Sequence, residues 1–247
     1  MAPNKREREY ARRRYEHYQQ HLAETRAKRH RQRTVAGAIL GVLVLVLGVS
    51  LAVSLTGGND TASPAASPSA SPTYTLPDPA TAEARTWTGT IATNVGDIGI
   101  ELDGAKAPQA VASFVSLAKQ GFFDNTTCHR LATGIKVLQC GDPTATGTGG
   151  PGYTFGPVEN APADGVYPAG TIAMARQSAN GSSMGSQFFL VYEDTTIPAD
   201  SAGGYTVFGR MTSGLDVVTA VADAGVQGGG TDGPPATGVT IQGVETQ

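Results

Sequence analysis

Cysteine, histidine and tryptophan are scarce in this 247-residue chain, which has two, four and one of them. Three of the histidines, His17, His21 and His30, lie near the N-terminus, which leaves only His129 in the rest of the chain. Zinc sites of the structural kind take four ligands, drawn mostly from Cys and His. The main part of the chain lacks such a set, and we expect it to hold neither a metal nor a cofactor.

Charges of opposite sign are concentrated in different parts of the chain. Residues 1–33 contain 11 Lys or Arg against four Asp or Glu, whereas the remaining residues contain seven against 17. Neutralising phosphates requires clustered cations, so nucleic acid is not expected as the partner of the acidic main part. The basic leader 1–33 is expected to be a solvated, partly helical cytoplasmic tail, whose last cations could attract anionic lipids.

Residues 34–55 form a long run without charge, directly after the basic leader. About 20 apolar residues are enough to cross a bilayer as a helix. A cleaved signal peptide is the alternative, since Ala52-Val53-Ser54 resembles a cleavage site, but the run exceeds the roughly 7–15 residues of a signal core. The positive-inside bias then predicts a single-pass cell-membrane protein, anchored by 34–55, with a cytoplasmic N-terminus and an extracytoplasmic main domain.

Composition changes twice after the apolar run. Residues 56–85 are rich in Pro, Ser, Ala and Thr, cannot bury enough apolar surface to order themselves, and are predicted to be a disordered linker. From 86 to 247, short apolar runs alternate with Gly-rich turns, which predicts one β-rich domain. Strands are predicted at 86–93, 98–102, 134–139, 171–175, 188–192, 205–211 and 239–244.

Two helices are predicted within this domain. Pro108 precedes a stripe of helical period that Gly121 ends, and Ser213 is the expected N-cap of a second helix that ends before Gly225. Many short strands with only two helices predict a mainly β fold, a closed or nearly closed antiparallel barrel with helical lids.

Two isolated motifs in the domain are misleading. Residues 147–152 fit the dinucleotide pattern G-x-G-x-x-G, but Pro151 prevents the helix that such a site needs. Residues 181–185 fit the nucleophile pattern G-x-S-x-G, but the domain's histidine, His129, lies upstream instead of downstream. Neither a nucleotide-dependent enzyme nor a hydrolase is indicated.

An ordered set of blocks is far more specific. They are GFFDNTTCHR (121–130), LQCGDPTATGTGGPGYTF (138–155), GTIAMA (170–175), GSQFFL (185–190) and YTVFGRM (205–211). Together they resemble the cyclophilin family of peptidyl-prolyl cis–trans isomerases, over about 87–244. The resemblance implies an eight-stranded antiparallel closed β-barrel capped by two α-helices, with a peptide groove on an outer face. The basic leader, apolar run and paired cysteines resemble the membrane-anchored forms from high-GC Gram-positive bacteria.

The resemblance also implies roles for individual residues. The catalytic arginine corresponds to Arg130, its glutamine neighbour to Gln139, and the phenylalanine beneath the proline pocket to Phe189. The substrate-binding positions correspond to Lys136, Val137, Ala175, Ile197 and Tyr205.

Several of these positions depart from the family pattern. Lys136 and Val137 stand where an adjacent Phe and Met are usual, and Tyr205 replaces a histidine. The usual tryptophan has no counterpart, so Ile197 is expected to fill the neighbouring apolar position. Arg176 stands where an asparagine is usual. The expected pocket wall is therefore smaller and more polar than is usual in the family.

Rotation about a peptide bond is opposed by about 18–20 kcal/mol, because the nitrogen lone pair is delocalised into the carbonyl. A catalyst needs a site that fits the twisted amide better than either planar form. Arg130 could donate to the prolyl nitrogen once its lone pair returns, and Phe189 could hold the ring. We expect a monomeric isomerase acting on proline-containing exported or envelope proteins. The alternatives are a Pro-peptide-binding module and an envelope scaffold with weak or no turnover.

Cys128 and Cys140 flank a predicted hairpin. A disulfide between them could persist outside the cytoplasm, and two buried thiols are the alternative.

Overall fold

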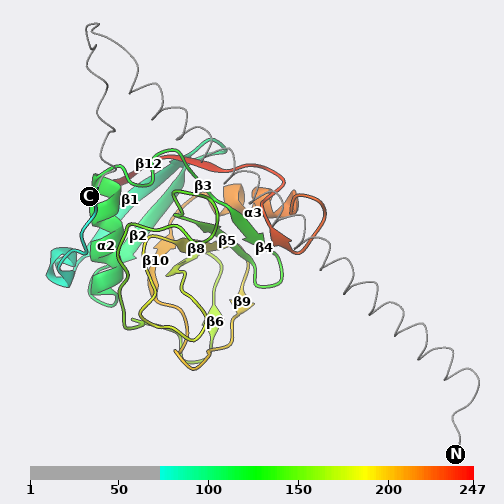
Figure 1. Cartoon of the computed structure of the whole chain (residues 1–247). Coiled ribbons are helices and arrows are strands. Elements are labelled where there is room, and N and C mark those ends of the chain that lie inside the picture. The colour runs from blue at the N-terminus through cyan, green and yellow to red at the C-terminus, as the bar shows by residue number, and fades with distance from the viewer. Residues whose placement is uncertain (1–72) are drawn as a thin grey trace, which may run out of the picture. The chain divides into compact units, whose positions relative to one another are not determined.

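The computed structural model describes residues 73–247 (Figure 1). The predicted tail 1–33, the predicted membrane helix 34–55 and the linker as far as residue 72 lie outside the described residues. Between residue 73 and the C-terminus, no helix is both long enough and apolar enough to cross a membrane.

Short strands dominate the described part of the chain. In order along the chain they are β1 (Thr86–Thr93), β2 (Ile98–Asp103), β3 (Thr126–Thr127), β4 (Arg130–Ala132), β5 (Val137–Cys140), β6 (Val166–Tyr167), β7 (Thr171–Met174), β8 (Phe188–Val191), β9 (Thr195–Thr196), β10 (Val207–Met211), β11 (Asp232–Gly233) and β12 (Thr240–Thr246). The helices are the 3₁₀ turn η1 (Pro79–Ala82), α2 (Pro108–Lys119) and α3 (Leu215–Asp223). The mainly β prediction with two α-helices is confirmed for this part.

The main sheet has ten strands, hydrogen-bonded in the order β11-β4-β5-β8-β7-β10-β2-β1-β12-β3. It curls, but β11 and β3 do not pair with each other, so the predicted closed, eight-stranded barrel is wrong in strand number and in closure. The reason is that residues 225–236 place β11 on the free edge of β4, while β12 is the one strand that forms a ladder with β3 among the described residues. An isolated bridge between Thr127 and Asp142 links β3 to the chain beyond β5. Strands β6 and β9 pair separately.

The inner face of the main sheet and α2 enclose the main core. Successive residues of a strand point to opposite faces, and on β8 it is Phe188 and Leu190 that point into this core. Phe114 of α2 lies 5.0 Å from Phe123, 5.4 Å from Phe188 and 5.3 Å from Phe208, measured between ring centroids. Burying an aromatic side chain contributes about 1.5–3 kcal/mol, so this cluster holds α2 on the sheet.

The second helix begins differently from the predicted cap, and the first has a cap that the sequence did not suggest. The first turn of α2 is capped from a distant loop, because the Glu159 carboxylate accepts from the N–H groups of Gln109 and Ala110, both at 3.0 Å. Ser213 does not cap α3. Gly214 occupies that position without a side-chain bond, and the Ser213 hydroxyl accepts from the Gly99 N–H at 3.1 Å.

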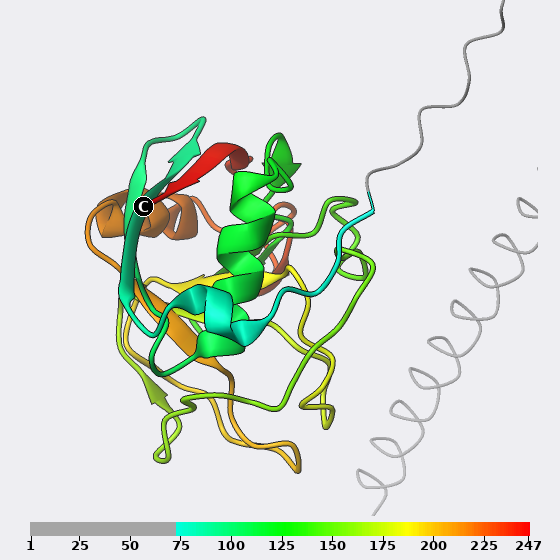
Figure 2. The same ribbon diagram turned by 90° about the vertical axis from the view of Figure 1, so that its left-hand side faces the viewer.

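The predicted linker 56–85 includes a segment that packs on the domain. Tyr74 stacks edge-on against Phe122, with ring centroids 4.9 Å apart. The Trp87 indole donates to the Ala82 carbonyl at 2.9 Å, and the Gln109 amide donates to the Pro77 carbonyl at 3.1 Å. These contacts place η1 beside α2, where Figure 2 shows it as a short cyan turn.

Candidate functional site

A row of residues crosses the outer face of the main sheet, opposite the main core. Arg130 is paired with Gln139, Gln139 with Phe189, Phe189 with Ala173, and Ala173 with Val207. Directly paired residues on neighbouring strands point to the same face. The register therefore brings together the three residues predicted to be catalytic, Arg130, Gln139 and Phe189.

A second apolar cluster, here called the outer cluster, covers this face. Phe189 and Ile197 in it are 4% and 7% exposed. Its buried members are Ala132, Val137, Tyr167, Ala173, Phe189, Val191 and Ile197, and Ile135, Ala175, Tyr205 and Val207 pack against them. Four of the five predicted substrate-binding residues are therefore in it or against it.

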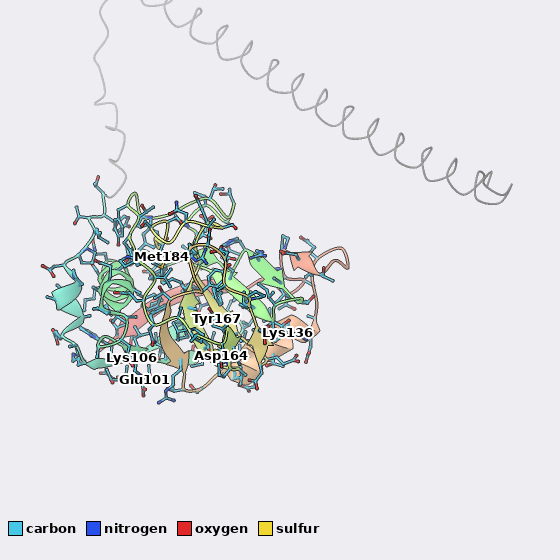
Figure 3. The ribbon with its side chains drawn as sticks, turned by 90° about the horizontal axis from the view of Figure 1, so that it is seen from below. Glu101, Lys106, Lys136, Asp164, Tyr167 and Met184 are labelled. Carbon is cyan, nitrogen blue, oxygen red and sulfur yellow. A yellow bond between two sulfur atoms is a disulfide. The ribbon has the colours of Figure 1, made fainter. Side chains whose placement is uncertain are left out.

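Lys136 differs from the other four predicted binding residues, because its side chain is taken up by an ion pair. It lies in the turn before β5 and has a φ of 56°, a left-handed conformation, whereas Val137 is the first residue of the strand. Its ammonium donates to the Glu193 carboxylate at 3.0 Å, and this bond raises the pKa of Lys136. The lysine, labelled in Figure 3, is therefore occupied by a surface ion pair.

Tyr205 forms one wall of the outer cluster. Its ring is edge-on to Phe189, with centroids 5.5 Å apart, and its backbone N–H donates to the Tyr167 hydroxyl at 2.8 Å. Tyr167 is fully buried, which raises the pKa of its phenol. A buried hydroxyl with a backbone partner fixes the position of the chain at Tyr205.

Arg176 holds the loop 198–205 in place. Its side chain is 1% exposed, and its guanidinium lies 4.6 Å from the centre of the Tyr205 ring. It donates to both carboxylate oxygens of Asp200 at 2.9 Å and to the carbonyls of Gly203 and Gly204 at 2.6 and 3.0 Å. Hydrogen bonds from Arg176 lower the pKa of Asp200. The sequence marked Arg176 only as a departure, because its partners in the loop 198–205 lie more than 20 residues away.

Arg130 is held on two edges. Its Nε and Nη2 atoms donate to the two carboxylate oxygens of Asp232, both at 2.7 Å, and Nη1 donates to Oε1 of Gln139 at 2.9 Å. The hydrogen bond to Asp232 raises the pKa of Arg130, and the same bond lowers that of Asp232. A bidentate charge-assisted pair of this kind fixes the plane of the guanidinium.

Gln139 is held in turn by Gln187 of the GSQFF block. The Gln139 amide donates to the Gln187 side-chain oxygen at 2.8 Å, and the Gln187 amide donates to the Gly149 carbonyl at 2.9 Å. The buried Asp142 organises that loop by accepting from the N–H groups of Gly147 and Gly149, at 2.6 and 3.0 Å. A side chain at Gly149 would overlap the Asp142 carboxylate, so this position requires glycine.

Sequence reasoning missed two members of this network, Asp232 and Gln187. Gln187 could have been found, since it lies inside the GSQFF block and two residues before Phe189. Asp232 lies in a Gly-rich stretch far from the other blocks, and only the pairing of β11 with β4 brings it to Arg130.

Two clefts adjoin at the Gln139 side chain, which lines both. One has a volume of about 710 Å³ and extends over residues 147–154, Ala175 and Gln187. The other has a volume of about 440 Å³ and lies over His129, Arg130 and Asp232. Burial lowers the pKa of His129, and among the described residues its ring nitrogens have no hydrogen-bond partner. A neutral imidazole therefore borders the second cleft.

Cys128 and Cys140 form a disulfide, which decides between the two alternatives left by the sequence. It joins the residue two positions before Arg130 to the residue after Gln139. Because Arg130 and Gln139 are themselves paired across β4 and β5, the disulfide fastens the end of this strand pair.

The arrangement provides a cation at the rim of an apolar surface. Within residues 73–247 no three His, Cys, Asp or Glu side chains lie close enough together to hold a metal ion. The site places a guanidinium of fixed orientation at the edge of the buried outer cluster and beside two clefts. Such a pair can bind a neutral acceptor atom attached to an apolar group.

Comparison with known proteins points to one family. The model of the cyclophilin-type peptidyl-prolyl cis-trans isomerase/CLD family matches residues 88–246. A probable peptidyl-prolyl cis-trans isomerase B of Mycobacterium leprae is 48% identical over 178 residues, 67% of this chain and 57% of the relative. The protein of that description from Mycobacterium tuberculosis is 50% identical over 167 residues, 62% of this chain and 52% of the relative. The chain thus spans about half the length of these mycobacterial relatives.

A solved structure has the same fold. The crystal structure of a cyclophilin-type isomerase from Cryptosporidium parvum matches with a TM-score of 0.55 and 25% identity, over 66% of this chain and 98% of the other.

Proposed function

The chain belongs to the cyclophilin-type peptidyl-prolyl cis–trans isomerase family, and from this premise we propose that it accelerates rotation about X–Pro bonds in polypeptides. The observation that carries the proposal is the paired row Arg130, Gln139 and Phe189, which sets a fixed guanidinium at the edge of the outer cluster. Uncatalysed X–Pro exchange takes tens to hundreds of seconds, so even a modest catalyst matters for folding.

We propose that Arg130 stabilises the twisted amide by donating to the prolyl nitrogen. In the planar amide that nitrogen is a poor acceptor, and it becomes an acceptor only as the bond rotates. The donor therefore binds the transition state more strongly than either ground state, which is the requirement for catalysis. A preorganised donor of this kind can change a rate by about 10²–10³-fold.

The apolar part of the site would hold the proline ring. Phe189 would form its floor and Val137 and Ile197 its sides, so that rotation is confined to one bond. The Ala175 N–H already donates to the Gln187 carbonyl at 2.9 Å, so the Ala175 carbonyl is the backbone group proposed to contact the peptide. Tyr205 would close the wall that Arg176 and Asp200 support.

Proline-containing polypeptides are the proposed substrates. A related Cryptosporidium parvum isomerase was crystallised in the presence of the dipeptide Ala-Pro. The apolar run 34–55 with its basic leader favours exported or envelope proteins as substrates, met by a monomer outside the cytoplasm.

The test is an exchange assay on a short Ala-Pro peptide with the full chain, purified in detergent because of the apolar run. Arg130→Ala should lower kcat/KM by about a hundredfold, since it removes the donor. Arg210→Ala is the matched control, because Arg210 also makes a bidentate pair, with Glu101, but on β10 and β2. Peptide binding without exchange would favour the binding-module alternative, and undiminished exchange by Arg130→Ala would reject the mechanism.

A further inference from the structure

We propose that Asp232 is a positioning residue for the guanidinium of Arg130, so that the segment after α3 takes part in catalysis. This inference rests on the proposed isomerase function and adds a residue to its mechanism. The segment comprises residues 225–236 and is called here the C-terminal hairpin.

The backbone of the C-terminal hairpin is fixed before and after Asp232. The Gln227 N–H donates to the Pro234 carbonyl and the Ala236 N–H to the Gly225 carbonyl, both at 2.8 Å. The Thr133 N–H donates to the Thr231 carbonyl at 2.9 Å, which joins the hairpin to the chain beyond β4. Asp232 therefore approaches Arg130 from a closed, hydrogen-bonded hairpin.

The register of β11 gives Asp232 the correct face. Asp232 is paired with Ala132, a member of the outer cluster, so its side chain points to the outer face. Arg130 is two residues from Ala132 and on the same face, which makes Asp232 its diagonal neighbour. Diagonal positions on adjacent strands are about 7–8 Å apart at Cα, within reach of a long side chain. Because aspartate is short, the long arginine side chain covers most of the separation between the two strands.

The hydrogen bonds leave a defined part of Arg130 for a substrate. An arginine side chain has five N–H groups. Within residues 73–247, Asp232 accepts from two of them and Gln139 from one. One N–H remains on each terminal nitrogen, and the planar group is held on two sides. Without Asp232, the guanidinium could rotate about its last bonds and take its free N–H groups away from a bound peptide.

Stability is not what this ion pair chiefly provides. The side chains of Arg130 and Asp232 are 38% and 53% exposed. Exposed ion pairs contribute little to folding, about 0–1 kcal/mol. Loss of the guanidinium's orientation should have a larger effect on the reaction rate, because a displacement of about 1 Å at a reacting group can lower a rate 10²-fold. The main effect of removing the carboxylate should therefore be on turnover.

The experiment compares Asp232→Asn with Glu101→Gln in the full chain, purified in detergent. Glu101 accepts from Nε and Nη2 of Arg210 at 3.0 and 2.8 Å, so it makes the same kind of pair. It lies on β2, which five strands separate from β11 in the main sheet. Asp232→Asn should lower kcat for Ala-Pro peptide exchange about tenfold, with KM nearly unchanged. Glu101→Gln should leave both constants unchanged, and the two thermal midpoints should fall equally.

Asp232→Glu provides the rescue, because a carboxylate one carbon longer can still pair with Arg130 and should recover part of kcat. An inactive wild-type chain would reject the proposed function itself. An active wild type with an inactive Arg130→Ala variant, but with Asp232→Asn as active as Glu101→Gln, would overturn only this inference. Faster turnover by Asp232→Asn would also overturn it, since the carboxylate would then be restraining the arginine.

Discussion

The two faces of the main sheet are made by alternate residues of the same strands, yet they are organised differently. On β8, Phe188 points into the main core, where it meets aromatic rings of α2 and its following turn, while Phe189 points into the outer cluster. The inner face is closed mainly by apolar side chains of α2 and its following turn, with Val218 and Val221 of α3. The outer face is bordered by Arg130, Arg176 and their carboxylates, which come from segments far apart in the chain.

This difference shows how one sheet can combine a stable fold with a specific site. An aromatic core is non-directional and tolerates volume-conserving exchange. A bidentate ion pair is directional, and its value lies in orientation. Mutations on the inner face should therefore change stability, and mutations at the border of the outer face should change turnover.

Phe188→Ala should have the largest effect on stability. Removing a buried aromatic ring from a core costs about 3–5 kcal/mol, and Phe188 is fully buried. We expect the free energy of unfolding, measured by urea titration, to fall by this amount, while kcat/KM per folded molecule stays the same. Phe189→Ala, its neighbour on the opposite face, is the control and should lower kcat/KM of the folded molecules. Equal effects of the two variants on turnover would remove the distinction between the faces.

Removal of the disulfide should have the next largest effect on the free energy of unfolding. Replacing both Cys128 and Cys140 by alanine should lower the free energy of unfolding by about 2–4 kcal/mol, because the unfolded chain loses a cross-link. The two positions are 12 residues apart. Urea titrations with and without reductant provide the measurement. Reductant should lower the free energy of unfolding of the wild type and leave that of the double variant unchanged. A wild type whose free energy of unfolding does not change with reductant would contradict the expectation.

Lowering the pH should weaken the ion pair between Asp200 and Arg176, which holds the loop 198–205. Its pKa is lowered from 3.8 because Arg176 donates to it, so its contribution to stability is complete above that ordinary value. The contribution is lost as the pH falls further, toward the lowered pKa of the folded state. Thermal midpoints measured from pH 5 downward should fall more steeply for the wild type than for Asp200→Asn. Parallel curves would mean that the pair with Arg176 adds nothing to folding.

Lys136→Ala should have the smallest effect. The lysine is paired with Glu193 on the surface. Exposed ion pairs are weak, so we expect kcat/KM to change by less than about twofold. Val137→Ala, at the next position, is buried and is the matched comparison. A large loss of turnover in Lys136→Ala would instead support the predicted role of this residue in substrate binding.

The sequence by itself determined both α-helices, the longer strands and three central residues of the site. Periodicity located α2 and most of the strands, and the ordered blocks located Arg130, Gln139 and Phe189, because these signals depend on neighbours in the chain. Only the tertiary structure decided the open strand order, the ion pair of Lys136 with Glu193, and the partners of Arg176 and Arg130. Asp232 reaches Arg130 across 102 residues of sequence. Such a contact depends on which strands become adjacent, and local residue patterns carry no information about that.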